Sequence, residues 1–329
     1  MRYPVDQIKE TIARLGSQRK AAAELGIPRS TLGDLMRRIE NATDDAIAGL
    51  FDGLDMVQTE RTETPYVGVS HGHWDNYGSA SENRSVLVLS DLHCPFEHPD
   101  TIPFLEELKS VVKPDRVVSH GDEVDMHQWN MHTHHPDLPN AKEEWARARE
   151  SIHRIERLFP DMLICESNHG SLAMRQRVNQ NMPFDVMASY GDALFAERDS
   201  QGNAYRPNGR GMGWQWHFSI DLRLCGKHPC HFVHSYGANV KNAAASMGCS
   251  LVQGHHHSLS EIHWVSSPVA QFFAMTVGSS IDEHALAFAY GKTSPKKPVI
   301  AHAAIIDGVP RIFPMFRDKR HNRWDGKIR

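Results

Sequence analysis

SVLVLSDLH, residues 85–93, is the stretch that decides the fold. Its first six residues form an apolar run of strand length, as expected for a strand buried on both faces of a sheet, and the run leads directly into Asp91 and His93. From Ser85 onward, similar short apolar runs alternate with stretches of helical periodicity. This alternation of apolar runs and helical stretches predicts an α/β domain with buried strands.

Four more apolar runs end in the same way. They are RVVSH (116–120) before Gly121 and Asp122, DMLICES (161–167) before Asn168 and His169, CHFV (230–233) before His234, and SLVQG (250–254) before His255, His256 and His257. The carboxyl ends of strands in open α/β sheets converge on one crevice, so these side chains should meet there. A buried edge crowded with imidazoles and carboxylates costs several kcal/mol unless something pairs them, and divalent cations would do so.

The segments around these endings resemble a known family. SDLH (90–93), HGDEVD (120–125), ESNHG (166–170), VHSYG (233–237) and QGHHH (253–257) are similar to the successive motifs of the calcineurin-like metallophosphoesterases, here of phage or bacterial type, over roughly residues 85–265. The resemblance implies an α/β fold, a β-sandwich flanked by helices. It also implies two bound divalent cations, with Mn²⁺ expected and Fe, Zn or Ni as alternatives, since mixed nitrogen and oxygen ligands suit these ions better than Mg²⁺ or Ca²⁺.

Matching the motifs position by position implies a ligand set. It consists of Asp91, His93 and His257 for the first metal, Asn168, His234 and His255 for the second, and Asp122 as the bridge between them. A water held between two such ions becomes a nucleophile near neutral pH, which suits hydrolysis of phosphate esters. The i, i+2 spacing within the first and last motifs places two ligands on one side of an extended segment, so His256 should point elsewhere.

Two residues are expected to take part in catalysis, Asp122 and His169. His169 matches the family histidine that contacts the phosphate and donates a proton to the leaving oxygen. Here the sequence departs from the family pattern, because Gly170 stands where an acid normally orients that imidazole, and Ser167 replaces a glycine. Either Asp125 or Glu123 substitutes for the missing acid, or turnover is slow.

Residues 1–40 are predicted to form a small all-α domain of three short helices. GSQRKAAAELGIPRSTLGDLMRRIE (16–40) reads as a helix, a turn at Gly26 and a second helix capped by Ser30, which resembles a helix-turn-helix unit. In the DNA-binding interpretation the contacts come from Arg29, Thr31, Asp34, Arg37 and Arg38. The alternative is a helical oligomerisation module, but eight Lys/Arg against five Asp/Glu favour nucleic acid, DNA first. Such units commonly work in pairs, so a homodimer is possible.

The rest of the domain organisation follows from composition. Residues 41–84 are predicted to be a linker, residues 85–310 the metallophosphoesterase domain, and residues 311–329 a basic C-terminal tail that either holds nucleic-acid backbone or is a solvated terminus. Residues 204–217, with Arg206, Arg210, Trp214 and Trp216, form either a wall that stacks bases or a hairpin loop with two core tryptophans.

The overall composition excludes several classes. Net charge is −4 over 329 residues, so the molecule as a whole is not a polycation, and any nucleic-acid binding must be local. No stretch reaches the roughly 18–20 apolar residues of a membrane span, and MRYPVDQIKE lacks the apolar segment of a secretory signal. Five cysteines, an odd number without a CxxC pair, indicate a reducing compartment. A cytoplasmic protein without membrane contact is therefore expected.

Three functions are compatible with these patterns. The first is a dinuclear-metal phosphodiesterase that cuts nucleic acid, which would connect the metal ligands with the N-terminal unit. The second is a phosphatase or phosphodiesterase for small molecules or phosphoproteins, because a fold of this kind serves many substrates. The third is a non-catalytic DNA-binding protein, against which the complete ligand set argues.

Overall fold

The computed structural model describes a defined part of the chain: residues 83–129, 135–181, 188–266, 268, 270–291, 295–318 and 320–329, together with residues 10–12, 14, 15, 20, 21 and 24. The chain divides into two compact units, residues 1–64 and 65–329, and each is described by itself. The described residues of the first unit are helical. The predicted DNA-contacting residues Arg29, Thr31, Asp34, Arg37 and Arg38 lie outside the described residues, so the helix-turn-helix unit stays a prediction.

The larger sheet of the second unit has six strands. Three of them, β1 (Ser85–Leu89), β2 (Arg116–Ser119) and β3 (Asp161–Cys165), are strands that the apolar runs predict. They are parallel to one another and to β6 (Gly213–His217). Beyond β1 the sheet continues antiparallel through β12 (Ala301–Ile306) and β13 (Val309–Pro314). The strand order is β13-β12-β1-β2-β3-β6.

The smaller sheet has five strands in the order β10-β11-β9-β8-β7. Their bounds are Ser219–Leu224 for β7, His228–Val233 for β8, Ser250–Gln253 for β9, Glu261–Ser266 for β10 and Gln271–Thr276 for β11. β8, β9 and β11 are parallel, and β7 and β10 are antiparallel to their neighbours. The remaining two predicted runs are thus confirmed as β8 and β9.

The two sheets pack face to face as a sandwich. Side chains of β1 alternate, as the two-residue period of a strand requires. Val86 and Val88 lie in a buried cluster with Leu222, Phe232 and other residues of the smaller sheet. Leu87 and Leu89 point the other way, into the cluster that the covering helices form with the larger sheet. Each β1 side chain named here is fully buried, which explains why the sequence shows an unbroken apolar run and no alternation.

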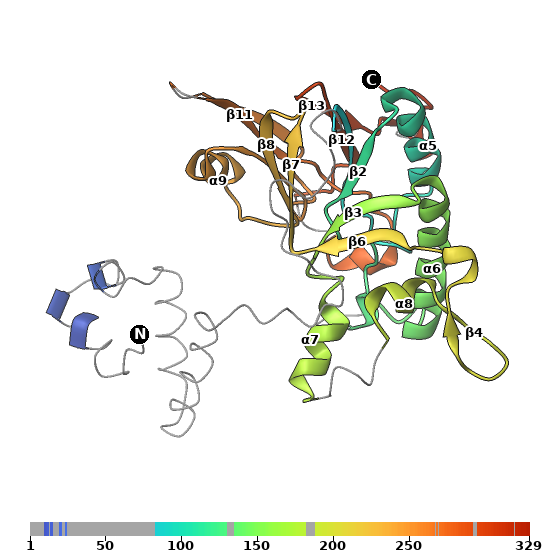
Figure 1. The fold of residues 1–329 in the computed structure, drawn as a ribbon. Helices are drawn as coiled ribbons and strands as arrows, with labels where there is room; N and C mark the ends of the chain where they lie inside the picture. Colours follow the sequence, from blue (N-terminus) through green and yellow to red (C-terminus); the bar gives the residue numbers. More distant parts are fainter. Residues whose placement is uncertain are drawn as a thin grey trace. The chain divides into compact units, whose positions relative to one another are not determined.

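Helices cover both outer faces of the sandwich (Figure 1). They are α5 (Thr101–Val112), α6 (Ala141–Leu158), α7 (Leu172–Asn179), α8 (Tyr190–Phe195) and α9 (Val240–Met247). α6 begins where the sequence provides a capping box: the Asn140 side chain accepts from the Glu143 backbone N–H, and the Glu143 side chain accepts from that of Asn140. None of the helices in the described part of the chain combines the length and apolar character that crossing a bilayer requires.

Short elements complete this unit. They are the 3₁₀ turns η2 (His127–Trp129), η4 (Pro207–Gly209) and η5 (Leu286–Gly291), and two small ribbons, β4 (Glu197–Arg198) with β5 (Ala204–Tyr205) and β14 (Arg317–Asp318) with β15 (Arg323–Trp324).

The structure corrects the predicted C-terminal tail. The boundary at residue 310 falls inside β13, which pairs with β12 over its full length. Farther on, the Arg323 guanidinium forms an ion pair with Asp100 beside α5, and the Trp324 backbone N–H donates to the same carboxylate over 2.8 Å. Basic composition left open a tail that holds nucleic-acid backbone or a solvated terminus, because composition does not register these few specific anchors.

The alternatives for residues 204–217 are also decided. Gly213–His217 is the edge strand β6, Trp214 is buried in the core, and its indole N–H donates to the Phe159 carbonyl over 2.8 Å. Trp216 is half-buried and donates to Glu123. Trp214 is therefore a core residue and Trp216 is partly buried against the same core, which favours the core interpretation over a base-stacking wall.

Candidate metal centre

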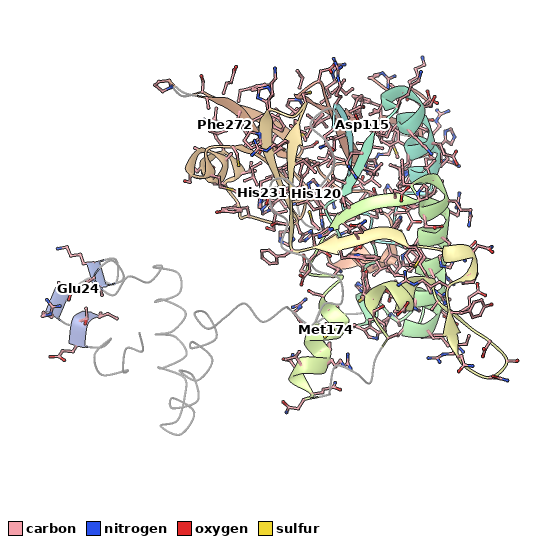
Figure 2. The ribbon with its side chains drawn as sticks, in the orientation of Figure 1. Glu24, Asp115, His120, Met174, His231 and Phe272 are labelled. Carbon is pink, nitrogen blue, oxygen red and sulfur yellow. The ribbon has the colours of Figure 1, made fainter. Side chains whose placement is uncertain are left out.

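Five strands from the two sheets end at the same edge of the sandwich. In Figure 2, Asp115 lies just before the start of β2 and His120 just after its end. Asp91 follows β1, Asp122 follows β2 and Asn168 follows β3, while His234 and His255 follow β8 and β9. All five residues follow the carboxyl ends of their strands. Because β1, β2 and β3 are parallel, their ends lie at one edge of the larger sheet, and the ends of β8 and β9, which are also parallel, lie at one edge of the smaller sheet.

One group of possible metal ligands consists of Asp91, His93, Asp122 and His257, whose donor atoms all lie within 4.8 Å of one another. The Nε2 atoms of His93 and His257 are 3.1 Å apart, and His257 Nε2 is 3.1 Å from Asp91 Oδ2. His93 Nε2 is 3.5 Å from Asp122 Oδ2. These are the four residues that the family resemblance places around the first metal.

A second group adjoins the first and consists of Asp122, His234 and His255. Asn168 belongs with it, because its Oδ1 is 2.5 Å from His234 Nε2 and 3.1 Å from His255 Nδ1. His234 Nε2 lies 3.5 Å from Asp122 Oδ2. The structure thus brings all seven candidate ligand residues together, in the two sets that the family resemblance implies.

Two buried carboxylate oxygens at this edge are suited to binding divalent cations. Asp91 Oδ1 and Asp122 Oδ2 are buried and have no hydrogen-bond partner among the residues that the structure describes. A buried carboxylate oxygen without a partner is costly, and a bound cation would remove that cost. Asp122 Oδ2 lies 3.5 Å from Nε2 of both His93 and His234, so this one oxygen stands between the two groups.

The orientation of the imidazoles supports the same interpretation. His93 Nδ1 donates to Asp125 Oδ1 over 2.6 Å, and His234 Nδ1 donates to the His120 carbonyl over 2.8 Å. In a neutral ring the opposite nitrogen, Nε2, is then an acceptor, as in metal-bound histidines. Each Nε2 faces another acceptor, and a shared cation would satisfy both. Ligands about 2.0–2.2 Å from one ion are roughly 2.8–3.6 Å apart, which is the spacing seen for most of these atoms.

His169 lies next to the first group, with its ring 4.7 Å from that of His93. Its Nδ1 donates to the main-chain carbonyl of Asp125, and the Asp125 carboxylate is 3.9 Å away. Of the two acids that could replace the one missing at Gly170, Asp125 is therefore the one that contacts His169. The Glu123 carboxylate instead accepts from the indole of Trp216 over 2.5 Å.

Electrostatics at this edge follow from burial and mutual contact. Burial raises the pKa of Asp122, but His234, His169, His93 and His257 outweigh burial and hold that pKa below its usual value. For His169, burial lowers the pKa, and the nearby Asp122 and Asp125 more than reverse this, so the pKa is raised. Burial raises the pKa of Glu123 to about 7.

Backbone geometry at the site is unusual in ways that the sequence did not indicate. His93, Asp122 and His255 adopt left-handed conformations, with φ of 54°, 47° and 64°. Such a conformation costs a non-glycine residue about 1–3 kcal/mol and concentrates at functional sites. Gly254 allows a close approach: a Cβ built there would lie 2.3 Å from Asp91 Oδ1 and 2.9 Å from His120 Cβ.

His256 points away from the other histidines' donor atoms, as the alternation along an extended segment predicts. Its Nε2 donates to the Gly237 carbonyl over 3.1 Å. This hydrogen bond connects the loop after β9 to the loop after β8, so His256 stabilises the arrangement of the two loops that carry His234, His255 and His257.

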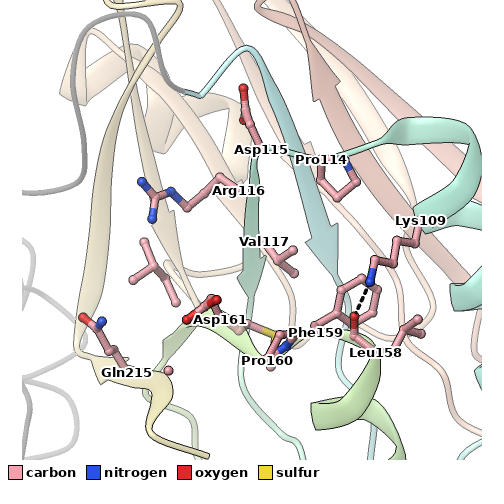
Figure 3. Close-up of a pocket in the computed structure, with 13 residues that line it drawn as sticks. Lys109, Pro114, Asp115, Arg116, Val117, Leu158, Phe159, Pro160, Asp161 and Gln215 are labelled. Carbon is pink, nitrogen blue, oxygen red and sulfur yellow. Dashed lines mark hydrogen bonds between the residues drawn. The ribbon is translucent and has the colours of Figure 1, made fainter.

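A pocket of about 440 Å³ lies at the opposite end of the strands, where β2, β3 and β6 begin (Figure 3). Two of its charged groups, Lys109 and Asp115, make hydrogen bonds within the protein. Lys109 Nζ donates to the Leu158 carbonyl over 2.7 Å, and Asp115 accepts from the backbone N–H groups of Arg84 and Ser85. No cluster of metal-ligating groups was found among its described residues, so the carboxyl edge is the candidate site.

The sequence matches no family model and no curated protein. Among solved structures, the chain is similar to Vps29 from Chaetomium thermophilum, with 13% identity, a TM-score of 0.38 and coverage of 72% of this chain and 91% of that one. It is also similar to vacuolar protein sorting 29 from Cryptosporidium parvum, with 13% identity, a TM-score of 0.34 and coverage of 74% and 94%. A third similar structure is a single mutant of Vps29 from Entamoeba histolytica, with 14% identity, a TM-score of 0.32 and coverage of 74% of this chain and 96% of that one. TM-scores below 0.5 are too low to argue from, so the fold and the site rest on the residues of this chain.

Proposed function

We propose that this chain is a phosphoesterase that depends on two divalent cations, Mn²⁺ first among them. The observation that carries the proposal is the position of Asp122 Oδ2. This atom is buried, has no hydrogen-bond partner in the described part of the chain, and lies 3.5 Å from a histidine nitrogen of each ligand group. Asp91, His93 and His257 would hold one ion with Asp122, and Asn168, His234 and His255 the other. Two ions so bound clamp the attacking and leaving oxygens at phosphorus and lower the pKa of a bound water.

The residues of the chain would supply the rest of the chemistry. Asp125 orients His169 through its carbonyl and orients His93 through its carboxylate. Asp122 and Asp125 raise the pKa of His169 against the effect of burial. In hydrolysis, water adds to phosphorus and releases a proton to solvent, the bond from phosphorus to the leaving oxygen breaks, and His169 would donate a proton to that oxygen and later regain one from solvent.

We further propose that the substrate is a nucleic-acid phosphodiester, DNA first, and that the N-terminal unit binds the polymer. Support comes from the sequence of residues 1–40, with its surplus of Lys and Arg and its helix-turn-helix pattern. A homodimer would follow if these units act in pairs.

A comparison of substrates tests the proposal. The full chain with Mn²⁺ is assayed on an aryl phosphomonoester, an aryl phosphodiester, and single- and double-stranded DNA, with Asp122→Asn as the control. The proposal expects cleavage of the diester and of DNA, abolished by chelation and reduced at least 100-fold by Asp122→Asn. Cleavage of the monoester alone would indicate a phosphatase, and no cleavage of any substrate would contradict an enzymatic role.

A further inference from the structure

A second pocket, of about 450 Å³, shares a wall with the candidate metal centre. Its lining includes His255 and His257 on one side and Lys296 and Lys297 on another, and we refer to it as the lysine pocket. The volume lies within the range of small-molecule pockets, roughly 300–1,000 Å³. A molecule bound at the metal centre would therefore extend directly into this space.

The segment that carries the two lysines is fixed to the metal-binding loop. The Val299 backbone N–H donates to the His257 carbonyl over 2.8 Å, and the Ser279 backbone N–H donates to the Val299 carbonyl over 2.9 Å. These bonds hold the lysine segment beside His257, so the lysines have a defined place relative to the metal ligands.

The charge of the lysine pocket suits an anion. Lys296 and Lys297 are exposed, and the acid in the lining, Glu283, is 3.5 Å from the Arg317 guanidinium, which offsets its charge. Lysine ammonium groups bind phosphate as point charges. The lysine pair thus favours a second anionic group at a distance from the one held by the metals.

Part of the remaining lining is apolar and includes an aromatic ring. Phe288 and Ile281 line the lysine pocket, and the Phe288 ring packs edge-on against the rings of His93 and Phe96, at centroid distances of 6.1 and 6.2 Å. An inorganic anion or a phosphorylated side chain would leave this apolar lining unused, whereas a nucleotide carries a flat base and a further phosphate.

We propose that the lysine pocket binds the nucleotide adjacent to the scissile phosphate, with its backbone phosphate near Lys296 and Lys297 and its base near Phe288. This inference rests on the proposed function and narrows the substrate to a polynucleotide chain of at least two phosphates.

The test uses the full chain and a tetrathymidylate, which is single-stranded and therefore offers no major groove to the N-terminal unit. The variant Lys296→Gln/Lys297→Gln is compared with Lys227→Gln/Lys241→Gln, which removes two positive charges at exposed positions elsewhere. Two readouts are taken. One is the ratio of kcat/KM for tetrathymidylate to kcat/KM for bis(p-nitrophenyl) phosphate with Mn²⁺. The other is anisotropy of fluorescent tetrathymidylate with metal-free protein.

We expect the lysine-pocket variant to lower both the ratio and the affinity about tenfold, which corresponds to about 1.4 kcal/mol. In a plot of log binding constant for tetrathymidylate against log salt concentration, the slope for this variant should be shallower by about 0.7 for each phosphate that it no longer binds. Phe288→Leu, which keeps apolar bulk but removes the ring, should weaken binding about fivefold or more. The lysine control should match the wild type.

Two outcomes would overturn the proposal: no change in the lysine-pocket variant, or an equal loss in both double variants, which would be a general charge effect. If the wild type cleaves neither substrate, the proposed function fails, and the anisotropy measurement still decides whether the lysine pocket binds the oligonucleotide.

Discussion

Single residues beside the candidate ligands shape the candidate site. Gly254 leaves room for Asp91, and Asp125 orients both His93 and His169. The family resemblance named seven candidate ligand positions because each lies within a few residues of the end of an apolar run. It could not choose between Asp125 and Glu123, because that choice depends on where the two side chains point: Glu123 turns toward Trp216.

Gly254→Ala tests the close approach at Asp91. The added methyl carbon would lie 2.3 Å from Asp91 Oδ1, and both that carboxylate and His120 are fully buried, so neither can move aside cheaply. We expect the variant to fold but to lose at least tenfold in Mn²⁺ affinity, measured by isothermal titration calorimetry. Unchanged metal affinity would show that Asp91 does not act as a ligand in its observed position.

Asp125→Asn tests orientation of the imidazoles. The substitution keeps the size of the side chain but removes the negative charge that accepts from His93 Nδ1 over 2.6 Å. Loss of such a supporting carboxylate typically lowers metal affinity or activity 10–100-fold, and we expect a loss in this range in kcat/KM for an aryl phosphodiester. If Asp125→Asn is as active as the wild type, Asp125 has no part in the site.

At the scale of helices and strands, the sequence predicts what depends on local pattern. All five apolar runs that end in ligands are strands, because burial on both faces requires continuous apolar sequence. β6 was not predicted as a strand: GWQWH is an edge strand with mixed burial and lies among glycines. The division into two sheets could not be predicted either, since strand pairing is set by contacts between residues far apart in the chain.

β12 carries a buried histidine whose titration should affect stability. His302 Nδ1 accepts from the Ser90 backbone N–H over 3.1 Å, and burial lowers the pKa of His302 to about 3. An unfolded histidine has a pKa of about 6.5, so below that pH the unfolded chain binds a proton that the folded chain does not. Stability should therefore fall as pH decreases from about 6.5 toward 3, by up to about 1.4 kcal/mol per pH unit from this group.

The measurement is urea unfolding of metal-free protein between pH 7 and 4, in the wild type and in His302→Gln. The variant should have a lower free energy of unfolding at pH 7. Its free energy of unfolding should also fall less steeply toward pH 4, because about one proton fewer is bound on unfolding. His228→Gln, which removes an exposed histidine, is the matched control. A decline in His302→Gln as steep as in the wild type would contradict the assignment.

At the scale of the whole molecule, the two units, residues 1–64 and 65–329, have different proposed roles, DNA binding and phosphoester hydrolysis. The described part of the second unit contains the candidate centre, and the DNA-contacting residues are predicted in the first. The N-terminal prediction rests on composition and capping pattern alone, which indicate helices and a turn but not which face meets a partner.

Arg29→Gln/Arg37→Gln/Arg38→Gln in the full chain tests this division. If these side chains contact DNA phosphates, duplex binding should weaken, and its log–log salt slope should become shallower by about 0.9 for each phosphate no longer bound. Hydrolysis of the small aryl phosphodiester should stay as in the wild type, because that substrate has no polymer to bind. Fluorescence anisotropy at several salt concentrations provides the measurement, and unchanged duplex affinity would leave the oligomerisation alternative.

The central claim is that two ions share Asp122. The most direct measurement is a crystal structure of the Mn²⁺-loaded protein with anomalous diffraction at the manganese edge. The account predicts two manganese peaks about 3.5–4 Å apart on either side of Asp122 Oδ2, one near His93 and His257 and the other near His234 and Asn168. A single peak, or no peak in this region at saturating Mn²⁺, would contradict it.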